Sequence, residues 1–392
     1  MKDIRGMRRR AWAEIDLFAV RENYRAVRAA VGKSTKVCCV VKADAYGHGA
    51  CRLAAVYEAM GADFFAVSNL EEALELRRGG ITLPILILGF TPPECAALLA
   101  RENISQCVYS EEYGLSLGKE AEAAGVRVKI HLKLDTGMGR IGFFGDELDG
   151  AEKVCRQSFL IPEGVFTHFA VSDGGEEGED YTRAQASRFC AWVEELSHRG
   201  ISFAIRHCAN SAAIFEYPEF HLDMVRAGIV LYGFRPSTCV RRLPRLYPVM
   251  TLRSVISHIK TLKAGESVSY GRTFVAEKPL RVATVPIGYA DGFSRSLGNG
   301  RYALKIGERY APILGRVCMD QLMVDVSEIP CSVGDTVTVL GDDGRVSADG
   351  IAEILNTINY EVTCDVSKRI PRVFLDEGEI VGFQDHLISD GE

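Results

Sequence analysis

The sequence V-C-C-V-V-K-A-D-A-Y-G-H-G runs from Val37 to Gly49, and the interpretation of the whole chain starts from it. The apolar run Val37–Val41 predicts a buried strand, which ends at Lys42 and is followed by a polar turn with two glycines. Partial burial lowers the pKa of an ammonium group from about 10.4, so a neutral, nucleophilic amine becomes accessible near neutral pH. Such an amine can bond covalently to a carbonyl compound. A lysine that extends its charged head into solvent fits these residues equally well.

The composition is that of an ordinary globular protein. The 392 residues are 47% hydrophobic and 25% charged, enough for about two or three domains with a large core. The net charge of −6 gives no reason to expect nucleic acid or an anionic membrane as a partner. Acidic residues from Glu14 onward interrupt the basic opening, so no apolar signal segment follows it. The apolar run Pro84–Phe90 is far too short to span a membrane.

Twelve cysteines are scattered along the chain without a C-x-x-C pair, and most lie in apolar runs. Cysteine used in this way, as a small hydrophobic residue, is typical of a reduced, cytoplasmic protein. A disulfide framework is the less favoured interpretation. The spacing required for structural zinc is missing, so we predict no metal site.

From Lys36 to Tyr232 the sequence alternates short apolar runs with amphipathic helical patterns. Eight strands, each followed by a helix, predict an α/β protein with a closed (β/α)8 TIM barrel. A doubly wound open sheet is the alternative, but its G-x-G-x-x-G fingerprint does not follow the first strand. The expected strands are Val37–Lys42, Phe64–Ser68, Ile85–Gly89, Ser105–Tyr109, Arg127–Leu134, Gly164–Phe169, Phe203–Cys208 and Leu222–Val225.

After Pro248 the pattern changes to short strands separated by glycine and proline turns, which predicts a β-rich C-terminal domain. We therefore expect a barrel domain over residues 1–245 and a β-rich domain over residues 246–392, joined by the linker Arg241–Pro248. The opening residues, through about Ala13, are expected to pair with either domain. Only Ala348–Asn356 has a clear helical pattern here. The expected strands are Thr251–Lys260, Arg281–Pro286, Tyr302–Ile306, Gln321–Val326 and Thr336–Leu340.

Unusual polar residues follow five of the eight barrel strands. The carboxyl ends of barrel strands form the active-site face of this fold, so these residues are expected to converge there. Each one alone could be a loop residue of no consequence. They are Lys42 with Tyr46, Asp135–Arg140, His168, Asn210 with Ser211, and Arg226–Gly228.

The last two of these loops carry groups that are typical of a phosphate-binding site. Barrels often bind phosphate between the loops after strands seven and eight. Ser211 offers a hydroxyl, and Gly228 and Ile229 offer backbone N–H groups at a predicted helix start. A reactive lysine facing a phosphate site describes a pocket for pyridoxal 5'-phosphate. An ordinary tight turn at Gly228 fits the same sequence.

Taken together, these motifs resemble those of the alanine racemases, which are fold-type III pyridoxal-phosphate enzymes. The resemblance covers nearly the whole chain, and its motifs occur in the order found in the family. They are Ala13–Asp16 with Asn23, Val41–Gly49, Leu132–Gly142, Thr167–Ala170, His207–Ser211, Arg226–Gly233, Val268–Gly271, Gly288–Gly292, Gly315–Asp320 and Asn359–Glu361.

The resemblance implies a PLP-dependent isomerase that interconverts L-alanine and D-alanine and supplies D-alanine for peptidoglycan. It implies a cytoplasmic homodimer with shared active sites, in which Lys42 and Tyr270 of the partner subunit are the two catalytic bases. Arg226 would face the pyridine nitrogen, and His168 would bridge Arg226 to the tyrosine. The remaining cofactor-binding residues would be Tyr46, Asn210, Ser211, Gly228, Ile229 and Tyr360.

The resemblance also implies a substrate site that both domains supply. Arg140 and the backbone of Met319 would lie near the substrate carboxylate, with Asp320 beside them. Tyr289, again from the partner, would narrow the entrance. Lys133 matches a position that is often carbamylated and then pairs with Arg140.

Physical chemistry supports two bases, because racemisation removes a proton from one face of the α-carbon and returns one to the other. An amino-acid decarboxylase of the same architecture would have a glutamate near the pyridine nitrogen, where Arg226 stands. A single-domain cofactor carrier would not explain a second domain with Tyr270 and Met319. A serine or broad-specificity racemase on the same scaffold remains an alternative.

Overall fold

The computed structural model describes residues 10–387. The basic residues Lys2 to Arg9, discussed above as part of the opening, lie outside this range. The chain forms two compact units, and each is described by itself. The barrel unit comprises Val20–Ala45 and Ala50–Tyr247. Of the described residues, the β-rich unit comprises those from residue 10 to Ala19, the short segment Tyr46–Gly49, and those from Pro248 to residue 387.

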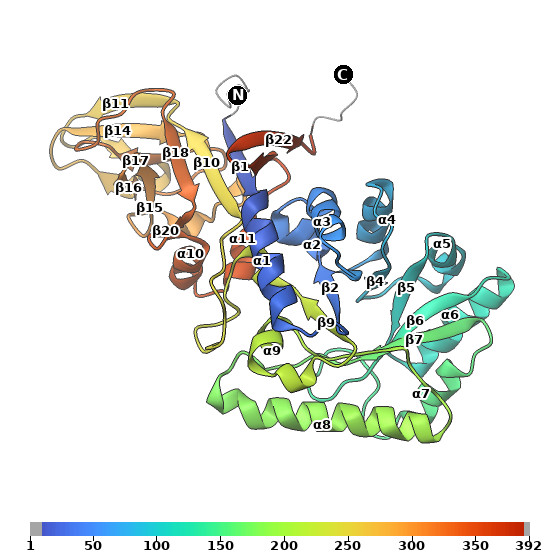
Figure 1. Cartoon of the computed structure of the whole chain (residues 1–392). Coiled ribbons are helices and arrows are strands. Elements are labelled where there is room, and N and C mark those ends of the chain that lie inside the picture. The colour runs from blue at the N-terminus through green and yellow to red at the C-terminus, as the bar shows by residue number, and fades with distance from the viewer. Residues whose placement is uncertain (1–9, 388–392) are drawn as a thin grey trace. The chain divides into compact units, whose positions relative to one another are not determined.

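Eight parallel strands form the barrel unit, in the order β8-β7-β6-β5-β4-β3-β2-β9 (Figure 1). Two backbone hydrogen bonds link the edges of this sheet, from Asp223 to the carbonyl of Arg206 (3.1 Å) and from Arg226 to that of Ala209 (3.0 Å). The barrel is therefore nearly closed, which confirms the predicted fold class. The strands are β2 (Lys36–Val40), β3 (Phe64–Val67), β4 (Ile85–Ile87), β5 (Ile104–Val108), β6 (Val128–Lys133), β7 (Leu160–Phe166), β8 (Ile205–His207) and β9 (Met224–Ala227).

The barrel strands are apolar along nearly their whole length because both of their faces are covered. Every residue of β3, β4, β5 and β9 is buried. A few polar side chains interrupt this pattern and are nevertheless buried. They are Ser105, Gln106, His131, Lys133, His207 and Arg226.

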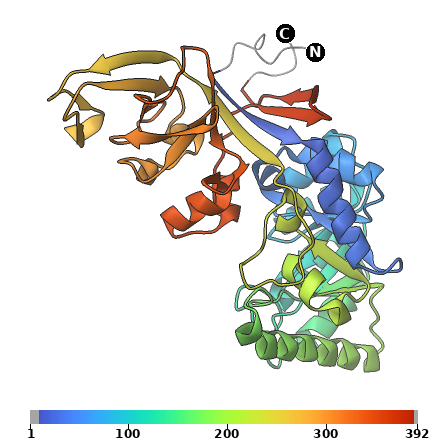
Figure 2. The same ribbon diagram turned by 60° about the vertical axis from the view of Figure 1, so that its left-hand side comes forward.

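Helices surround the barrel, and several begin with a side-chain cap. Asn69 caps α4 and Ser110 caps α6, each accepting a hydrogen bond from a first-turn N–H. The longest helix, α8, is the green helix in Figures 1 and 2. The helices are α1 (Leu17–Ala30), α2 (Lys42–Gly47), α3 (Ala50–Ala59), α4 (Leu70–Arg78), η2 (Pro93–Cys95), α5 (Ala96–Arg101), α6 (Glu111–Ala123), α7 (Leu148–Cys155), α8 (Glu176–His198), α9 (Ser211–Glu216), η3 (Pro218–Phe220) and η4 (Ile229–Tyr232).

A ten-stranded sheet dominates the β-rich unit, in the order β11-β14-β17-β16-β15-β18-β10-β1-β21-β22. The N-terminal strand β1 (Ala11–Asp16) pairs antiparallel with β10 and parallel with β21. The predicted strand Thr251–Lys260 is two strands, β10 (Met250–Val255) and β11 (His258–Leu262), because the chain turns at Ile256 and Ser257. The other strands are β12 (Ser267–Val268), β13 (Phe274–Val275), β14 (Leu280–Val285), β15 (Ala303–Ile306), β16 (Arg309–Leu314), β17 (Leu322–Asp325), β18 (Thr336–Leu340), β19 (Asp342–Asp343), β20 (Val346–Ser347), β21 (Arg372–Asp376) and β22 (Glu379–Gln384).

The helical segments of this unit are short. The predicted helix Ala348–Asn356 is α10 (Ala348–Leu355), followed by a second helix that the sequence pattern did not reveal, α11 (Asn359–Cys364). Single turns carry several of the residues discussed below. These turns are η5 (Tyr270–Arg272), η6 (Tyr289–Asp291) and η7 (Arg295–Leu297).

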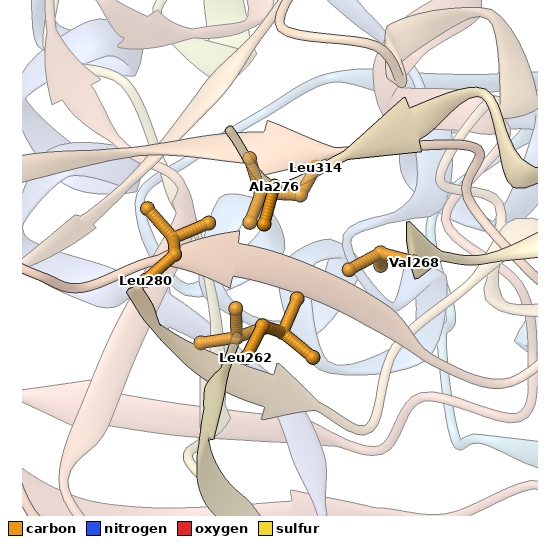
Figure 3. Close-up of a cluster of buried hydrophobic side chains, with 6 residues drawn as sticks. Leu262, Val268, Ala276, Leu280 and Leu314 are labelled. Atoms are coloured by element: carbon orange, nitrogen blue, oxygen red, sulfur yellow. The ribbon is translucent and has the colours of Figure 1, made fainter. Parts of the chain in front are cut away.

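A small apolar cluster anchors one end of the sheet (Figure 3). Phe274 and Met323 pack against it. Val268 belongs to the cluster and stands two residues before Tyr270, so this packing fixes the base of the loop that carries the tyrosine. The six members are Leu262, Val268, Ala276, Leu280, Val282 and Leu314.

Candidate active site

Lys42 begins an unusual turn. Strand β2 ends at Val40, two residues earlier than expected, and Lys42 is the half-buried first residue of α2. From Ala43 to Tyr46 the φ angles lie between 52° and 55°, which makes this a left-handed turn without glycine. Such a conformation costs roughly 1–2 kcal/mol per residue for L-amino acids and persists only where its surroundings hold it.

Two carboxylates hold this turn. Glu72 accepts a hydrogen bond from the N–H of Ala43 and one from that of Ser68, each at 2.7 Å. Asp44 accepts a hydrogen bond from the N–H of Ala50 at 2.8 Å. Lys42 is thereby fixed at the carboxyl end of β2. The sequence around Glu72, which forms α4, gives no indication that its carboxylate contacts this turn.

Arg226 lies in β9 and is 3% exposed. Its guanidinium donates hydrogen bonds to the carbonyl oxygens of Thr167 (2.7 Å), His207 (3.1 Å) and Cys208 (3.1 Å). Burial lowers the pKa of Arg226 to about 10, so it remains protonated at neutral pH. No carboxylate within residues 10–387 forms an ion pair with it. Arg226 is thus a buried cation held only by neutral acceptors.

His168 stands two residues beyond the end of β7, next to this cation. Its Nδ1 lies 3.3 Å from Nη2 of Arg226. Because a guanidinium only donates, Nδ1 must accept and Nε2 must carry the imidazole proton. Burial, together with the positive charges of Arg226, Arg140, Lys133 and Lys42, holds the pKa of His168 well below its usual value. His168 is therefore a neutral imidazole with one N–H left to donate.

The loops after β8 and β9 meet at a buried group of hydrogen-bond donors. The hydroxyl of Ser211 accepts a hydrogen bond from the N–H of Gly228 at 2.9 Å. Asn210 caps α9 by accepting from the N–H of Ala213 (3.1 Å) and also accepts from the hydroxyl of Ser172 (2.8 Å). Ile229 is fully buried, and its N–H has no acceptor among the residues described. A buried N–H without an acceptor, beside a hydroxyl and at the start of η4, fits a phosphate group.

The loop after β6 is held by the carboxylate of Asp135, which accepts from four successive backbone N–H groups. These belong to Gly137 (2.9 Å), Met138 (2.8 Å), Gly139 (3.1 Å) and Arg140 (3.1 Å). Burial alone would raise the pKa of Asp135, but these donors and Lys133 outweigh it and the pKa is lowered. The loop therefore has a defined shape, and it presents the exposed Arg140 at the carboxyl end of β6.

Lys133 is the last residue of β6 and is 3% exposed. Its ammonium donates a hydrogen bond to the carbonyl of Leu134 at 2.7 Å and lies 5.7 Å from the centre of the Phe166 ring. Burial lowers the pKa of Lys133 to about 8. The ammonium form therefore still predominates at pH 7, but roughly a tenth of this side chain is then the neutral amine, far more than for an ordinary lysine.

Helix α8 supplies support that sequence reasoning missed. Gln185 donates to the carbonyl of His168 (3.1 Å) and accepts from the N–H of Ala170 (2.9 Å). Arg188 donates to the carbonyl of Thr136 (2.8 Å), and Tyr181 donates to that of Gly137 (2.7 Å). These three residues lie on one face of α8. Their i, i+4, i+7 spacing was the available signal, but it gave no indication of the loops they would hold.

The β-rich unit contains the two tyrosines expected at the phosphate. The Tyr46 and Tyr360 rings lie 6.0 Å apart, and burial raises the pKa of Tyr46. The segment that follows Tyr46 is tied down by the fully buried Arg372, which donates to the carbonyl of Gly47 at 2.9 Å. A side chain at residue 47 would lie 2.3 Å from the carbonyl oxygen of Thr363, so only glycine fits there.

Three other expected residues of this unit are unusually exposed for large apolar side chains. Tyr270 is 67% exposed, Met319 52% and Tyr289 41%. Their loops are joined by hydrogen bonds from the hydroxyl of Ser269 to the carbonyl of Arg316 (2.6 Å) and from the N–H of Tyr289 to that of Cys318 (3.1 Å). The three side chains thus stand on one supported group of loops around residues 316–319.

The remaining predicted residue, Asp320, pairs with Arg369 at 2.8 Å. Arg369 also approaches the fully buried carboxylate of Asp291 (3.7 Å), which forms a second ion pair with Arg10. Asp291 ends the turn that carries Tyr289. Asp320 therefore belongs to an ion-pair network that stabilises the loops of Tyr289 and Met319.

The barrel unit places Lys42, His168, Ser211 and Arg226 at the carboxyl ends of its strands. Lys133, the last residue of β6, lies at the same ends. The β-rich unit brings Tyr270, Tyr289 and Met319 to one group of loops, and Tyr46 to Tyr360. No helix in the described part of the chain combines the length and the apolar character needed to cross a membrane.

Two protein-family models match the chain. One, described as "Alanine racemase, N-terminal domain", matches residues 15–236, and the other, "Alanine racemase, C-terminal domain", matches residues 249–374. Alanine racemase 1 of Clostridium acetobutylicum is 45% identical over 385 residues, which cover 97% of this chain and 99% of that protein.

Solved structures agree over nearly the full length. The alanine racemase of Clostridium difficile 630 has a TM-score of 0.92 at 41% identity and covers 97% of this chain and 99% of its own. A crystal structure of alanine racemase from Bacillus anthracis with bound L-Ala-P has a TM-score of 0.91 at 36% identity and covers 97% of this chain and 98% of its own.

The lowered pKa of Lys133 gives a testable pH dependence of stability. In the unfolded chain the lysine titrates near 10.5, so between about pH 8 and 10.5 the unfolded state binds more protons than the folded state. The free energy of unfolding should therefore rise with pH in that window. In CO2-free buffer, the rise from pH 8 to 10 should be about 2 kcal/mol larger for the wild type than for Lys133→Met. Urea denaturation at each pH measures it; parallel curves for the two proteins would contradict the buried, depressed amine.

Proposed function

The chain belongs to the alanine racemase family, and we propose how its own residues interconvert L-alanine and D-alanine. It is an isomerase that uses pyridoxal 5'-phosphate. When bound, this cofactor withdraws electrons from the α-carbon of the amino acid and so makes its hydrogen acidic. The chain must hold the cofactor, place the amino acid and move one proton on each face of the α-carbon.

We propose that Lys42 binds the cofactor covalently and that the donor group at Ser211, Gly228 and Ile229 holds its phosphate. The buried N–H of Ile229 supports this role, because it needs an acceptor. Asn210 acts by capping α9, which fixes Ser211. Tyr46 and Tyr360 are proposed to complete the phosphate contacts with their hydroxyls.

Arg226 is proposed to face the pyridine nitrogen. Its guanidinium only donates hydrogen bonds and keeps its proton at neutral pH, so it favours an unprotonated ring nitrogen. A ring with an unprotonated nitrogen withdraws electron density from the α-carbon less strongly. This favours return of the proton to the α-carbon over side reactions. A glutamate at this position would have the opposite effect.

The two bases are proposed to be Lys42, through its Nζ, and Tyr270 of the partner subunit, through its hydroxyl. The Arg226–His168 hydrogen bond is the single observation that carries this proposal. It fixes the imidazole proton of His168 on Nε2, where it can donate to a tyrosinate oxygen. A tyrosine ordinarily titrates near pH 10, and a donor linked to a cation is what would make it a usable base.

A homodimer with shared sites follows from this assignment. Tyr270, Tyr289 and Met319 expose large apolar surfaces on one group of supported loops, and such a surface is typical of an interaction site. We propose that this part of the β-rich domain, residues 246–392, reaches the active site that the partner subunit's barrel domain forms. Free thiols at all twelve cysteines support a reducing, cytoplasmic location, where D-alanine would supply peptidoglycan synthesis.

For the substrate, we propose that Arg140 and the backbone of Met319 hold the carboxylate. Tyr289 and Asp320 would shape the entrance. Lys133 is proposed to be carbamylated and to pair with Arg140, since its neutral amine is the form that adds CO2.

The carbamate has a direct test. Addition of 13C-labelled bicarbonate to the purified protein should produce a carbamate carbon resonance, which Lys133→Met should lack. Because the neutral amine is the reactive form, the resonance should grow as the pH rises from 7 to 8. A wild-type spectrum without this resonance would leave Lys133 as a plain amine.

The two-base mechanism predicts an asymmetric defect in Tyr270→Phe. If the tyrosine removes the proton of L-alanine and Lys42 that of D-alanine, the variant should still exchange the α-hydrogen of D-alanine with deuterium. Exchange from L-alanine, and net racemisation, should fall by at least about a hundredfold, as is typical for loss of a general base. NMR of each enantiomer in D2O measures both rates. Equal exchange from both enantiomers would remove Tyr270 from its role.

The shared site predicts complementation between two inactive variants. Lys42→Ala and Tyr270→Phe subunits, once mixed, should form hybrid dimers in which one of the two sites holds both wild-type bases. Activity should then return toward about a quarter of the wild-type value for random exchange, since half the dimers are hybrid. Mass spectrometry of differently labelled subunits confirms exchange. Exchange without recovered activity would mean that each chain builds its own site.

A further inference from the structure

A chain of hydrogen-bonded side chains links the buried Arg226 to the partly buried Glu163, and we propose that Glu163 and His131 are positioning residues for Arg226. This inference rests on the proposed role of Arg226 at the cofactor ring. It assigns a function to the fully buried His131 and the partly buried Glu163, which touch neither cofactor nor substrate in the scheme above.

The chain has three consecutive hydrogen bonds. Nη1 of Arg226 lies 2.9 Å from Nδ1 of His207, and Nε2 of His207 lies 2.9 Å from Nδ1 of His131. Nε2 of His131 then lies 3.2 Å from Oε2 of Glu163. Both histidines are fully buried, and burial is the main cause that lowers the pKa of each. The link therefore runs through two neutral imidazoles.

The proton positions in this chain are fixed from both ends. Arg226 can only donate, so Nδ1 of His207 accepts and its Nε2 carries the proton. That proton is donated to Nδ1 of His131, whose own proton must then lie on Nε2. An ionised carboxylate can only accept, so Glu163 requires the same arrangement. The two ends agree, and every donor in the chain faces an acceptor.

The groups around Glu163 keep its carboxyl group ionised. The hydroxyl of Ser105 donates to it at 2.6 Å, and the ammonium of Lys129 lies 3.5 Å away. Burial alone would raise the pKa of Glu163, but His131, Ser105 and Lys129 lower it to about 2. A fixed negative charge thus terminates the chain that begins at the buried cation.

The backbone has two local adaptations at this point. The β6–β7 pairing shifts from Ile130 opposite Pro162 to His131 opposite Gly164, so Glu163 is the extra residue of a β-bulge. A bulge turns a side chain away from its regular direction. At Gly164, a side chain would come within 2.4 Å of the His131 ring. The bulge and the glycine together allow Glu163 and His131 to meet.

The consequence for Arg226 is electrostatic and geometric. Within the described residues no carboxylate contacts its guanidinium, and Glu163 is the anion that its hydrogen-bond chain through His207 and His131 reaches. Polarisation along such a chain strengthens each bond, and His207 becomes a stronger acceptor for Arg226. The His207 ring also stacks on Phe166 (4.8 Å between ring centres), over which the guanidinium lies at 5.4 Å. Fixing His207 therefore fixes the guanidinium.

A metal site is the competing interpretation of a His–His–Glu group. The two ring nitrogens that face each other are at hydrogen-bond distance and leave no room for an ion between them. Nor do the described residues contain any group of three or more His, Cys, Asp or Glu side chains arranged to hold a metal.

The first test measures the protons directly. Long-range 1H–15N correlation spectra of the wild-type holoenzyme, labelled with 15N-histidine, should show His131 and His207 as neutral rings protonated on Nε2. His131→Gln and His207→Gln identify the two signals. A proton on Nδ1 of either ring, or a charged ring at neutral pH, would overturn the proposal. This measurement does not depend on turnover, so it can fail or succeed independently of the two-base scheme.

The second test removes the charge and keeps the shape. Glu163→Gln retains an oxygen that can accept from His131 but loses the carboxylate. We expect kcat to fall about tenfold with KM for alanine within about twofold, and the His131 Nε2 proton resonance to move upfield. Glu58→Gln is the matched control. Glu58 is also a barrel carboxylate with three hydrogen bonds, to the N–H and hydroxyl of Thr82 and the N–H of Leu83, and has no bond to a histidine.

The control should keep wild-type kcat and an unshifted His131 resonance. Kinetics of Glu163→Gln that match those of Glu58→Gln would reduce Glu163 to a structural residue and overturn the proposal. If Glu163→Gln does not fold, the wild-type proton positions decide the question.

Discussion

The protonated guanidinium of Arg226 is the group on which the polar interior of the barrel depends. It donates hydrogen bonds to three backbone carbonyls and to two imidazole nitrogens. The two bonds to imidazole nitrogens also determine where those rings carry their protons. Because arginine cannot accept, it imposes one proton position on His168 and one on His207. Without the arginine, no donor at residue 226 would select the His168 tautomer, and the position of the His207 proton would be set by Glu163 alone. One cation thus determines the donors available at the carboxyl end of the barrel.

Burying such a cation is destabilising because it loses its hydration. The barrel offsets this loss with hydrogen bonds rather than with an ion pair. A buried charge without partners is strongly destabilising, whereas a fully bonded polar group can be tolerated. The left-handed turn after Lys42 is likewise unfavourable by itself, and it is stabilised by hydrogen bonds to Glu72, outside the turn, and to Asp44, within it. At the Arg226 cation and at the turn after Lys42, an arrangement that is unfavourable by itself is stabilised by hydrogen bonds to groups with no proposed part in the chemistry.

The sequence predicted those features that depend on residues close together in the chain. All eight barrel strands appear where apolar runs end in polar loops, and the structure places the residues after those runs at the carboxyl ends of the strands. The structure also holds arrangements that no local pattern can reveal. Glu72 accepts a hydrogen bond from Ala43, and Gln185 donates one to the carbonyl of His168. In each pair the residues are distant in the sequence and are brought together by tertiary packing. His131 and His207 were visible as polar residues in apolar strands, but their partnership depends on a bulge at Glu163 that periodicity does not predict.

The geometry of the barrel also gives the physical reason for proposing a second subunit. Groups on strand ends approach a bound molecule from the same face of the barrel, so Lys42 is proposed to serve only one side of an α-carbon. His168 is neutral, and its free Nε2–H makes it a donor rather than a base. We therefore propose that the second base comes from a separately supported surface. Tyr270 has the required properties, since an apolar cluster holds its loop while its own side chain stays 67% exposed.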